Sequence, residues 1–169
     1  MLNPCSACSA DCCKNYVITI TSFDAVRIME RTGKGFSEFA VLEPLRLLNF
    51  DNDTVLECYR GGLRYDYVLA LRSHHCLFLK RDRCSIRSFA PLVCRIYPHT
   101  ESGQVIGGAR CPMAANALFR LKGADRSLPN YRKQLGEYRK LVAEWNRKRG
   151  TVAECARFLV SRSRKIGIF

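Results

Sequence analysis

Ten of the 169 residues are cysteine, the residue type in this sequence best able to do chemistry. Four of them lie within nine residues near the start of the chain, and four more are spread over its middle. A Cys-x2-Cys loop such as Cys5 to Cys8 lets two thiolates converge on one metal ion, while backbone N–H groups of the turn stabilise the charge on sulfur. The sequence therefore predicts a metal centre. Its candidate ligands are Cys5, Cys8, Cys12, Cys13, Cys76, Cys84, Cys94 and Cys111.

Metal coordination is favoured over disulfide bonds by the compartment that the sequence predicts. The chain opens on cysteines, without the charged region and apolar run of a signal peptide, and no window approaches the roughly eighteen apolar residues of a membrane span. We therefore expect a cytoplasmic protein, in which thiols stay reduced. Cys58 lies in a predicted strand and Cys155 on the apolar face of a predicted helix, so we expect both to be buried as hydrophobic residues.

The identity of the metal depends on how the eight sulfurs are shared. They suit two four-cysteine sites or one cluster with spare thiols, and spacing does not partition them. Neighbouring side chains in an extended segment point apart, so Cys12 and Cys13 would serve two metals or leave one sulfur unused. Four thiolates suit both zinc and iron–sulfur chemistry. The surplus of cysteines and the lack of zinc-ribbon spacing favour an iron–sulfur cluster of the 4Fe–4S type, with zinc as the alternative.

Residues around the second group of cysteines also suit a metal centre. Pro91 and Pro98 fix the backbone on either side of Cys94, which reduces the entropy lost when its thiolate is held. Arg95 is then a candidate for contacting the cofactor. Positive charge lowers the pKa of a nearby thiol and offsets the charge of a thiolate cluster, although a single basic side chain is more often simply solvated. The basic residues near Cys84 are Lys80, Arg81, Arg83 and Arg87.

Three histidines accompany these cysteines. His74 and His75 precede Cys76, and His99 follows Pro98. Each has the chemistry of a metal ligand or a proton donor. Because eight sulfurs are available, the site needs none of the histidines as a ligand.

Three stretches of the sequence carry a resemblance to a known family. They are Cys5-Ser-Ala-Cys8-Ser-Ala-Asp-Cys12-Cys13, then Val17-Ile18-Thr19-Ile20-Thr21-Ser22-x-Asp24-x-x-Arg27-Ile28, and Cys84-Ser-Ile86-Arg-x-x-x-Pro91-Leu92-Val93-Cys94-Arg95-Ile96-Tyr97-Pro98. They resemble the cysteine-cluster (CxxCxxCC) family of zinc- or iron-chelating domains, to which flagellin lysine N-methylases are similar. The resemblance covers about residues 5–112 and implies metal chelation; the similarity to enzymes thought to carry clusters adds support for iron–sulfur. Here three residues, not two, separate Cys8 from Cys12.

The elements that must position the cysteines form a small, loop-rich α+β domain with a short sheet. Alternating and β-branched residues predict a strand over 16–21. Ser22 is expected to cap a helix over 23–31 that ends at Gly33, and a second short helix is expected over 36–42.

A β-hairpin is predicted in the middle of the chain. Its strands cover 55–59 and 63–71, and Arg60-Gly61-Gly62 makes the turn. The cysteine-bearing region that follows is rich in loops, with short strands expected at 77–79 and 105–106.

Amphipathic, basic helices are predicted from about residue 113. Apolar residues recur there at intervals of three and four and line one face of a helix. Gly150 ends this helix, and a capping box over 151–154 begins a last one. No linker is apparent, so we expect a single domain over 1–169. The residues of the apolar face are Tyr131, Leu135, Tyr138, Val142 and Trp145.

The net charge of +13 belongs mainly to this C-terminal part, because residues 120–169 hold 14 Lys and Arg against 4 Asp and Glu. A surface of this kind attracts an acidic protein, a larger complex, nucleic acid or an anionic membrane.

Three functions fit these observations. The first is a metal-binding protein that holds an iron–sulfur cluster and acts in electron transfer or as a subunit of a larger assembly. The second, by similarity to the flagellin methylases, is cluster-dependent methyl transfer from S-adenosylmethionine to a protein lysine, although no Gly-x-Gly-x-x-Gly follows a strand. The third is a zinc-stabilised nucleic-acid-binding module, whose weakness is that the helix aromatics fall on the apolar face rather than where they would stack on bases. No residue is assigned a catalytic role.

Overall fold

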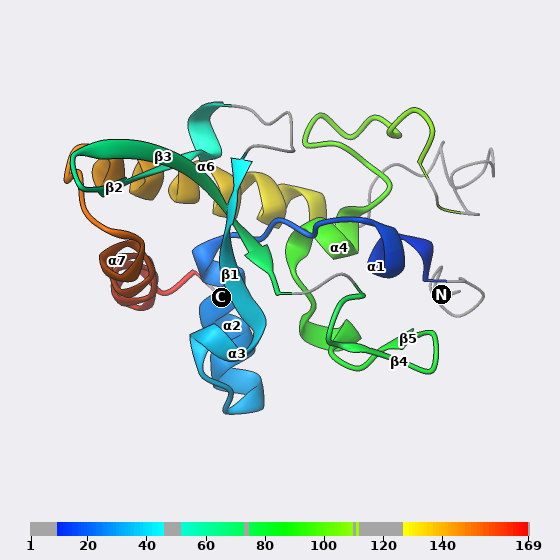
Figure 1. Cartoon of the computed structure of the whole chain (residues 1–169). Coiled ribbons are helices and arrows are strands. Elements are labelled where there is room, and N and C mark those ends of the chain that lie inside the picture. The colour runs from blue at the N-terminus through cyan, green and yellow to red at the C-terminus, as the bar shows by residue number, and fades with distance from the viewer. Residues whose placement is uncertain (1–9, 46–51, 73–74, 110, 112–126, 169) are drawn as a thin grey trace.

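A three-stranded antiparallel sheet and the helices packed around it make up an α+β fold (Figure 1). The computed structural model describes residues 10–45, 52–72, 75–109, 111 and 127–168. Cys5, Cys8, His74 and the first residues of the helical region expected from about residue 113 lie outside these ranges. The helices are α1 (Asp11–Asn15), α2 (Ser22–Thr32), α3 (Phe36–Phe39), α4 (Leu92–Ile96), α6 (Ser127–Asn146) and α7 (Val152–Ile166), with 3-10 turns η3 (Asn52–Thr54) and η4 (Arg87–Phe89). The strands are β1 (Ala40–Pro44), β2 (Leu56–Arg60), β3 (Leu63–Leu71), β4 (Leu79–Lys80) and β5 (Arg83–Cys84).

The sheet has the strand order β1-β3-β2, and its β2–β3 hairpin is the one that the sequence predicts. Gly61 and Gly62 adopt φ angles of 58° and 80° in the turn, which glycine reaches without steric cost. The expected helix over 36–42 is wrong in its second half: α3 ends at Phe39, and β1 then pairs with the second half of β3. Pairing with a strand distant in sequence decides this conformation, because β preference depends on the neighbouring strand.

The strand expected over 16–21 is reduced to a single β-bridge between Thr19 and Ala70. Ile20 N–H donates to Leu69 O at 2.9 Å. Since β2 pairs only with the first part of β3, this segment takes the place beside the last part. The segment between α1 and α2 thereby extends this edge of the sheet toward the elements that carry the cysteines.

The small strands expected near the cysteines are partly present. β4 begins at Leu79 and pairs with β5, whereas Val105 forms only a bridge with His99. Pairing between two such short strands contributes little stability by itself, so their structure depends on the residues that pack around them.

The helix caps follow local sequence signals. α2 has its N-cap at Thr21, one residue before the expected Ser22, because Thr21 and Asp24 form a capping box. Asp24 N–H donates to Thr21 Oγ1 at 3.2 Å, and Thr21 N–H donates to Asp24 Oδ2 at 3.1 Å. The expected glycine C-cap of this helix has a φ of 70°, and the predicted capping box over 151–154 begins α7.

α6 packs against β2, α4 and α7, and lies beside the sheet in Figure 1. Trp145 is 2% exposed, and its Nε1–H donates to Glu57 O at 2.9 Å. Cys58 and Cys155 are buried in the same core, as predicted. Among the described residues, no helix has the length and apolar composition needed to cross a membrane.

Two glycines in and after α6 have opposite surroundings. A Cβ at Gly150 would meet Trp145 Cη2 at 2.4 Å, whereas a Cβ at Gly136 would meet nothing within 4 Å. We expect Gly150→Ala to lower the free energy of unfolding by about 1–3 kcal/mol through overpacking. The control Gly136→Ala is expected to raise it by about 0.5–1 kcal/mol, because alanine loses less entropy in a helix. Urea unfolding measures both, and equal stability of the two variants would contradict this packing of Trp145.

Candidate metal centre

Six of the eight candidate ligands line one cavity of about 70 Å³. This space is several times the roughly 10–15 Å³ that one buried water requires. The other walls are mainly apolar and include Ile18, Leu71, Phe78 and Ile86. The structure thus brings sulfurs from both sequence groups to one place. The six residues are Cys12, Cys13, Cys76, Cys84, Cys94 and Cys111.

Local contacts hold the two groups of cysteines together. Cys76 N–H donates to Cys13 O at 2.8 Å, which joins the turn before β4 to α1. The β4–β5 hairpin then returns the chain so that Cys84 lines the same cavity. On another side, the rings of Tyr16 and Tyr97 pack edge to face with centroids 6.0 Å apart, which holds the segment after α1 against the end of α4.

The adjacent cysteines do not point apart as expected. That expectation assumed an extended backbone, but Cys12 and Cys13 lie on the short helix α1. Successive residues of a helix are turned by only about 100°. Their Sγ atoms are 4.0 Å apart, and both residues line the cavity.

The thiols of the cavity strongly affect one another's ionisation. Desolvation raises the pKa of Cys94 well above its ordinary value, and nearby Cys13 and Cys12 raise it further. The hydrogen bond from Cys12 lowers the pKa of Cys13, but the bond to Cys76 and burial outweigh this effect and raise that pKa to about 12. The pKa of Cys76 is lowered, mainly by the hydrogen bond between its thiol and that of Cys13. A cation in the cavity would supply the charge that lets several of these thiols ionise together.

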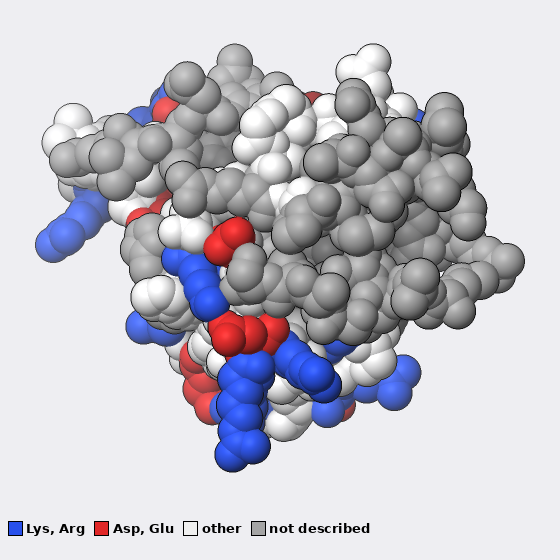
Figure 2. Space-filling view, turned by 90° about the vertical axis from the view of Figure 1, so that its right-hand side faces the viewer, with Lys and Arg blue, Asp and Glu red and all other residues white. Residues whose placement is uncertain are grey.

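Basic side chains contribute unequally to this site. Arg87 lines the cavity, and its Nη1–H donates to Cys94 O at 3.2 Å. Arg95 is half-buried and is not among the described residues that line the cavity. The other basic residues near Cys84 are exposed on the β4–β5 hairpin. Figure 2 views the molecule from the side of this hairpin, and Lys or Arg and Asp or Glu side chains lie next to each other on the described part of that face.

A buried carboxylate on α2 positions the helix that carries Cys94. Asp24 is 1% exposed and accepts from Leu92 N–H at 3.1 Å, at the start of α4. It also forms an ion pair with Arg27, whose guanidinium donates to Ala90 O at 3.3 Å. The Asp24-x-x-Arg27 spacing places both side chains on one face of a helix. The i, i+3 spacing of opposite charges is the sequence signal for this pair, and the sequence alone assigned it no role.

Neither of the two described histidines lines the cysteine cavity. His75 is exposed, and His99 is buried with its Nδ1 3.0 Å from Ile96 O; neither lines the cavity. In the described part of the chain, no group of three or more His, Cys, Asp or Glu side chains is already arranged to hold a metal ion. The sulfurs therefore line one cavity, and they must rotate or shift to coordinate one metal ion.

Comparison with known proteins supports metal binding by this part of the chain. A model of the CxxCxxCC family, described as a "putative zinc- or iron-chelating domain", matches residues 4–112. All eight candidate cysteines fall within the match, which ends before α6. No curated protein and no solved structure matches the chain.

Proposed function

Because the chain belongs to the CxxCxxCC family of zinc- or iron-chelating domains, we propose that its cysteine cavity holds an iron–sulfur cluster, of the 4Fe–4S type. The observation that carries this proposal is the space among the sulfurs. Four thiolates at about 2.3 Å from a zinc ion lie about 3.8 Å from one another and leave no room for further atoms. Six cysteines around a cavity of about 70 Å³ suit a polyatomic group better.

The chain's own residues would serve such a cluster in distinct ways. Its thiolates come from the eight candidate cysteines, and Arg87 offsets part of their charge. Apolar walls such as Phe78 and Ile86 keep water away, which is one of the ways in which a protein sets a cluster's potential. When bound, the cluster would supply one-electron chemistry. A role in electron transfer, or as a subunit of a larger assembly, follows from that chemistry.

Zinc is the second candidate, favoured by one specific observation. The 4.0 Å separation of the Cys12 and Cys13 sulfurs is close to that of two ligands on one zinc ion. In that case the centre would be structural and would stabilise a loop-rich part of the fold.

An acidic protein is the partner that the C-terminal helices support best. Tyr138 and Trp145 are buried and cannot stack on bases. Part of the basic surface is neutralised within the molecule, as by Arg162 Nη2 and Glu144 Oε2 at 2.9 Å. The exposed remainder would steer an acidic surface toward the protein. These exposed residues include Lys133, Arg147, Arg157, Arg164 and Lys165.

We also propose that the chain is one domain over 1–169 and that the protein lies in the cytoplasm. α6 and α7 contribute to the same hydrophobic core as α2 and the sheet, which supports one domain over 1–169. Reduced thiols in the cavity suit the cytoplasm, where cysteines remain available to metals.

Metal and acid-labile sulfide content, with an absorption spectrum, test the proposal on protein purified without oxygen. We expect iron and sulfide in equal amounts, about four of each per chain, and a broad visible absorption band. Zinc without sulfide would replace the cluster by a structural zinc site. Protein that binds neither metal, including after reconstitution with iron and sulfide, would refute both assignments.

A further inference from the structure

One residue of the described wall of the cysteine cavity is also exposed to solvent. Asp82 lines the cavity and 62% of its side chain is accessible, whereas the other described residues of the wall are buried or half-buried. Asp82 lies in the turn between β4 and β5. The tip of this hairpin therefore marks the side on which the described wall of the cavity meets solvent.

An ion pair joins this carboxylate to the first helix. Lys14 Nζ lies 2.5 Å from Asp82 Oδ1, and Lys14 directly follows Cys12 and Cys13 on α1. Figure 1 shows α1 and the β4–β5 hairpin at the same end of the molecule. The pair thus connects the helix that carries two of the sulfurs with the hairpin that carries Cys84, at the edge of the cavity.

The hairpin itself is weakly held. β4 and β5 have two residues each, so their pairing contributes little stability. Arg81 and Asp82 adopt φ angles of 48° and 56° in the turn, a left-handed conformation that glycine or asparagine reaches more easily than arginine. The position of the tip therefore depends on its contacts with other elements, and the ion pair to α1 is such a contact.

The strength of this ion pair suits a contact that opens and closes. The Lys14 side chain is 34% exposed and that of Asp82 is 62% exposed, so water and dissolved salt screen their attraction. Pairs of this exposure change an equilibrium between open and closed forms by about twofold to fivefold. The pair therefore favours the closed tip without locking it.

We propose that the Lys14–Asp82 ion pair is a gate through which metal leaves and enters the cysteine cavity. The inference rests on the proposed metal binding by that cavity. With the pair made, the tip of the hairpin covers the thiols; with the pair broken, the tip moves away from α1 and uncovers them. Neither side chain is a ligand, so the pair controls the rate of exchange and not the amount of metal held.

Release of metal to a chelator tests the gate on the full chain, purified without oxygen and with its centre in place. The chelator is in excess and absorbs light when it binds the released metal, and metal content is measured before mixing. Asp82→Asn and Lys14→Gln are each expected to release metal about twofold to fivefold faster, with unchanged metal content. The double variant should be no faster than either single variant, because the two side chains form one interaction. Lys14→Arg keeps the charge and is expected to release metal at the native rate.

Salt provides a second readout of the same contact. Raising sodium chloride from about 0.05 M to about 0.5 M shortens the range of electrostatic attraction. Release from the native chain is expected to accelerate toward the rate of Asp82→Asn, while the rate of that variant stays constant. A native rate that does not depend on salt would show that the ion pair does not limit release.

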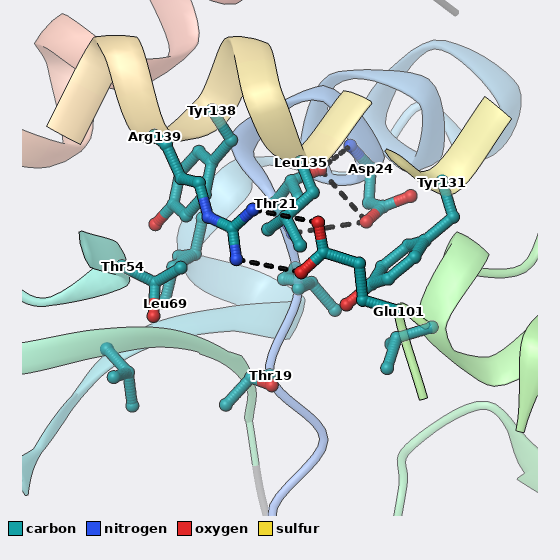
Figure 3. Close-up of a pocket in the computed structure, with 13 residues that line it drawn as sticks. Thr19, Thr21, Asp24, Thr54, Leu69, Glu101, Tyr131, Leu135, Tyr138 and Arg139 are labelled. Atoms are coloured by element: carbon teal, nitrogen blue, oxygen red, sulfur yellow. Dashed lines mark hydrogen bonds and ion pairs between the residues drawn. The ribbon is translucent and has the colours of Figure 1, made fainter. Parts of the chain in front are cut away.

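A second ion pair supplies the matched control. Glu101 accepts two 2.8 Å bonds from Arg139 at a separate cavity of about 240 Å³, beside Tyr138 and the last part of β3 (Figure 3). Glu101→Gln makes the same change of charge as Asp82→Asn, outside the described wall of the cysteine cavity. Its release rate is expected to stay native even if its stability in urea falls. Equal acceleration in Glu101→Gln would mean that release follows a general loss of stability, and would overturn the gate.

The same measurements separate failure of the gate from failure of the proposed function. If the native chain holds metal and both Asp82→Asn and Lys14→Gln release it at the native rate, the gate is refuted and metal binding stands. If the native chain holds no metal, including after reconstitution with iron and sulfide, metal binding is refuted and the gate with it. Variants that lose metal content would assign the pair to the support of the centre, which also contradicts a gate.

Discussion

Replacing Cys94 with alanine is expected to remove the metal and to unfold the elements around it. Cys94 lies on α4 among the sulfurs of the cavity, and α4 packs against α6. Because binding energy at a thiolate centre is also folding energy, losing one ligand affects both. We expect metal content to fall to less than about a tenth, and the melting temperature to drop by about 10 °C, which corresponds to roughly 3–5 kcal/mol for a chain of this size.

Cys155→Ala is the matched control for this variant. Cys155 is 0% exposed and lies outside the cavity, so the same sulfur is removed from a packed environment. A loss of about 1–2 kcal/mol with unchanged metal content is expected, because packing and the thiol contact with Cys58 are affected but no candidate ligand is removed. Cys94→Ala protein with full metal content and unchanged melting would show that Cys94 is not a ligand.

Asp24→Ala is expected to destabilise the fold almost as much, without removing a sulfur. The substitution leaves the Arg27 side chain, which is 12% exposed, without its carboxylate partner and frees the Leu92 N–H at the start of α4. Breaking a buried ion pair from one side costs about 3–5 kcal/mol. Because the lost contacts orient the helix that carries Cys94, metal affinity is expected to fall about 10- to 100-fold. Denaturant unfolding and competition with a chelator measure the two effects.

Asp66→Ala provides the comparison at a surface ion pair. Asp66 pairs with Arg64, whose side chain is 53% exposed, so its loss is expected to cost less than about 1 kcal/mol. Metal affinity should not change. If Asp24→Ala and Asp66→Ala lowered stability equally, or if Asp24→Ala bound metal as tightly as the native chain, Asp24 would have no positioning role.

The parts of the fold that were predictable carry strong local signals. The glycine turn between β2 and β3, the capping box before α7 and the apolar stripe of α6 each depend on a few neighbouring residues, and each was found. β1 was missed because its conformation depends on pairing with β3, a strand more than twenty residues away. The strand expected over 16–21 was overestimated, since how much of it pairs depends on where β2 stops.

The candidate site was predictable in kind but not in arrangement. Cysteine density alone selected the candidate residues, yet gathering six of them around one cavity depends on α1, α4 and the β4–β5 hairpin together. Arg87 lines the cavity whereas Arg95 does not, because the backbone between them turns through η4 and α4. The space beside Tyr138 had no sequence signal, because a void is set by packing that a pattern of apolar residues does not specify.

The distance along the chain between the cysteines of the cavity also determines when, during synthesis, the cavity can form. Cys12 and Cys76 are 64 residues apart, and Cys94 and Cys111 come later still. At roughly 5–20 residues per second, the ribosome makes Cys76 about 3–13 s after Cys12. During that interval the first thiols are outside any shared cavity and exposed to oxidants and to competing metals. A metal centre that uses sulfurs from both groups would therefore be loaded only after most of the polypeptide has been made.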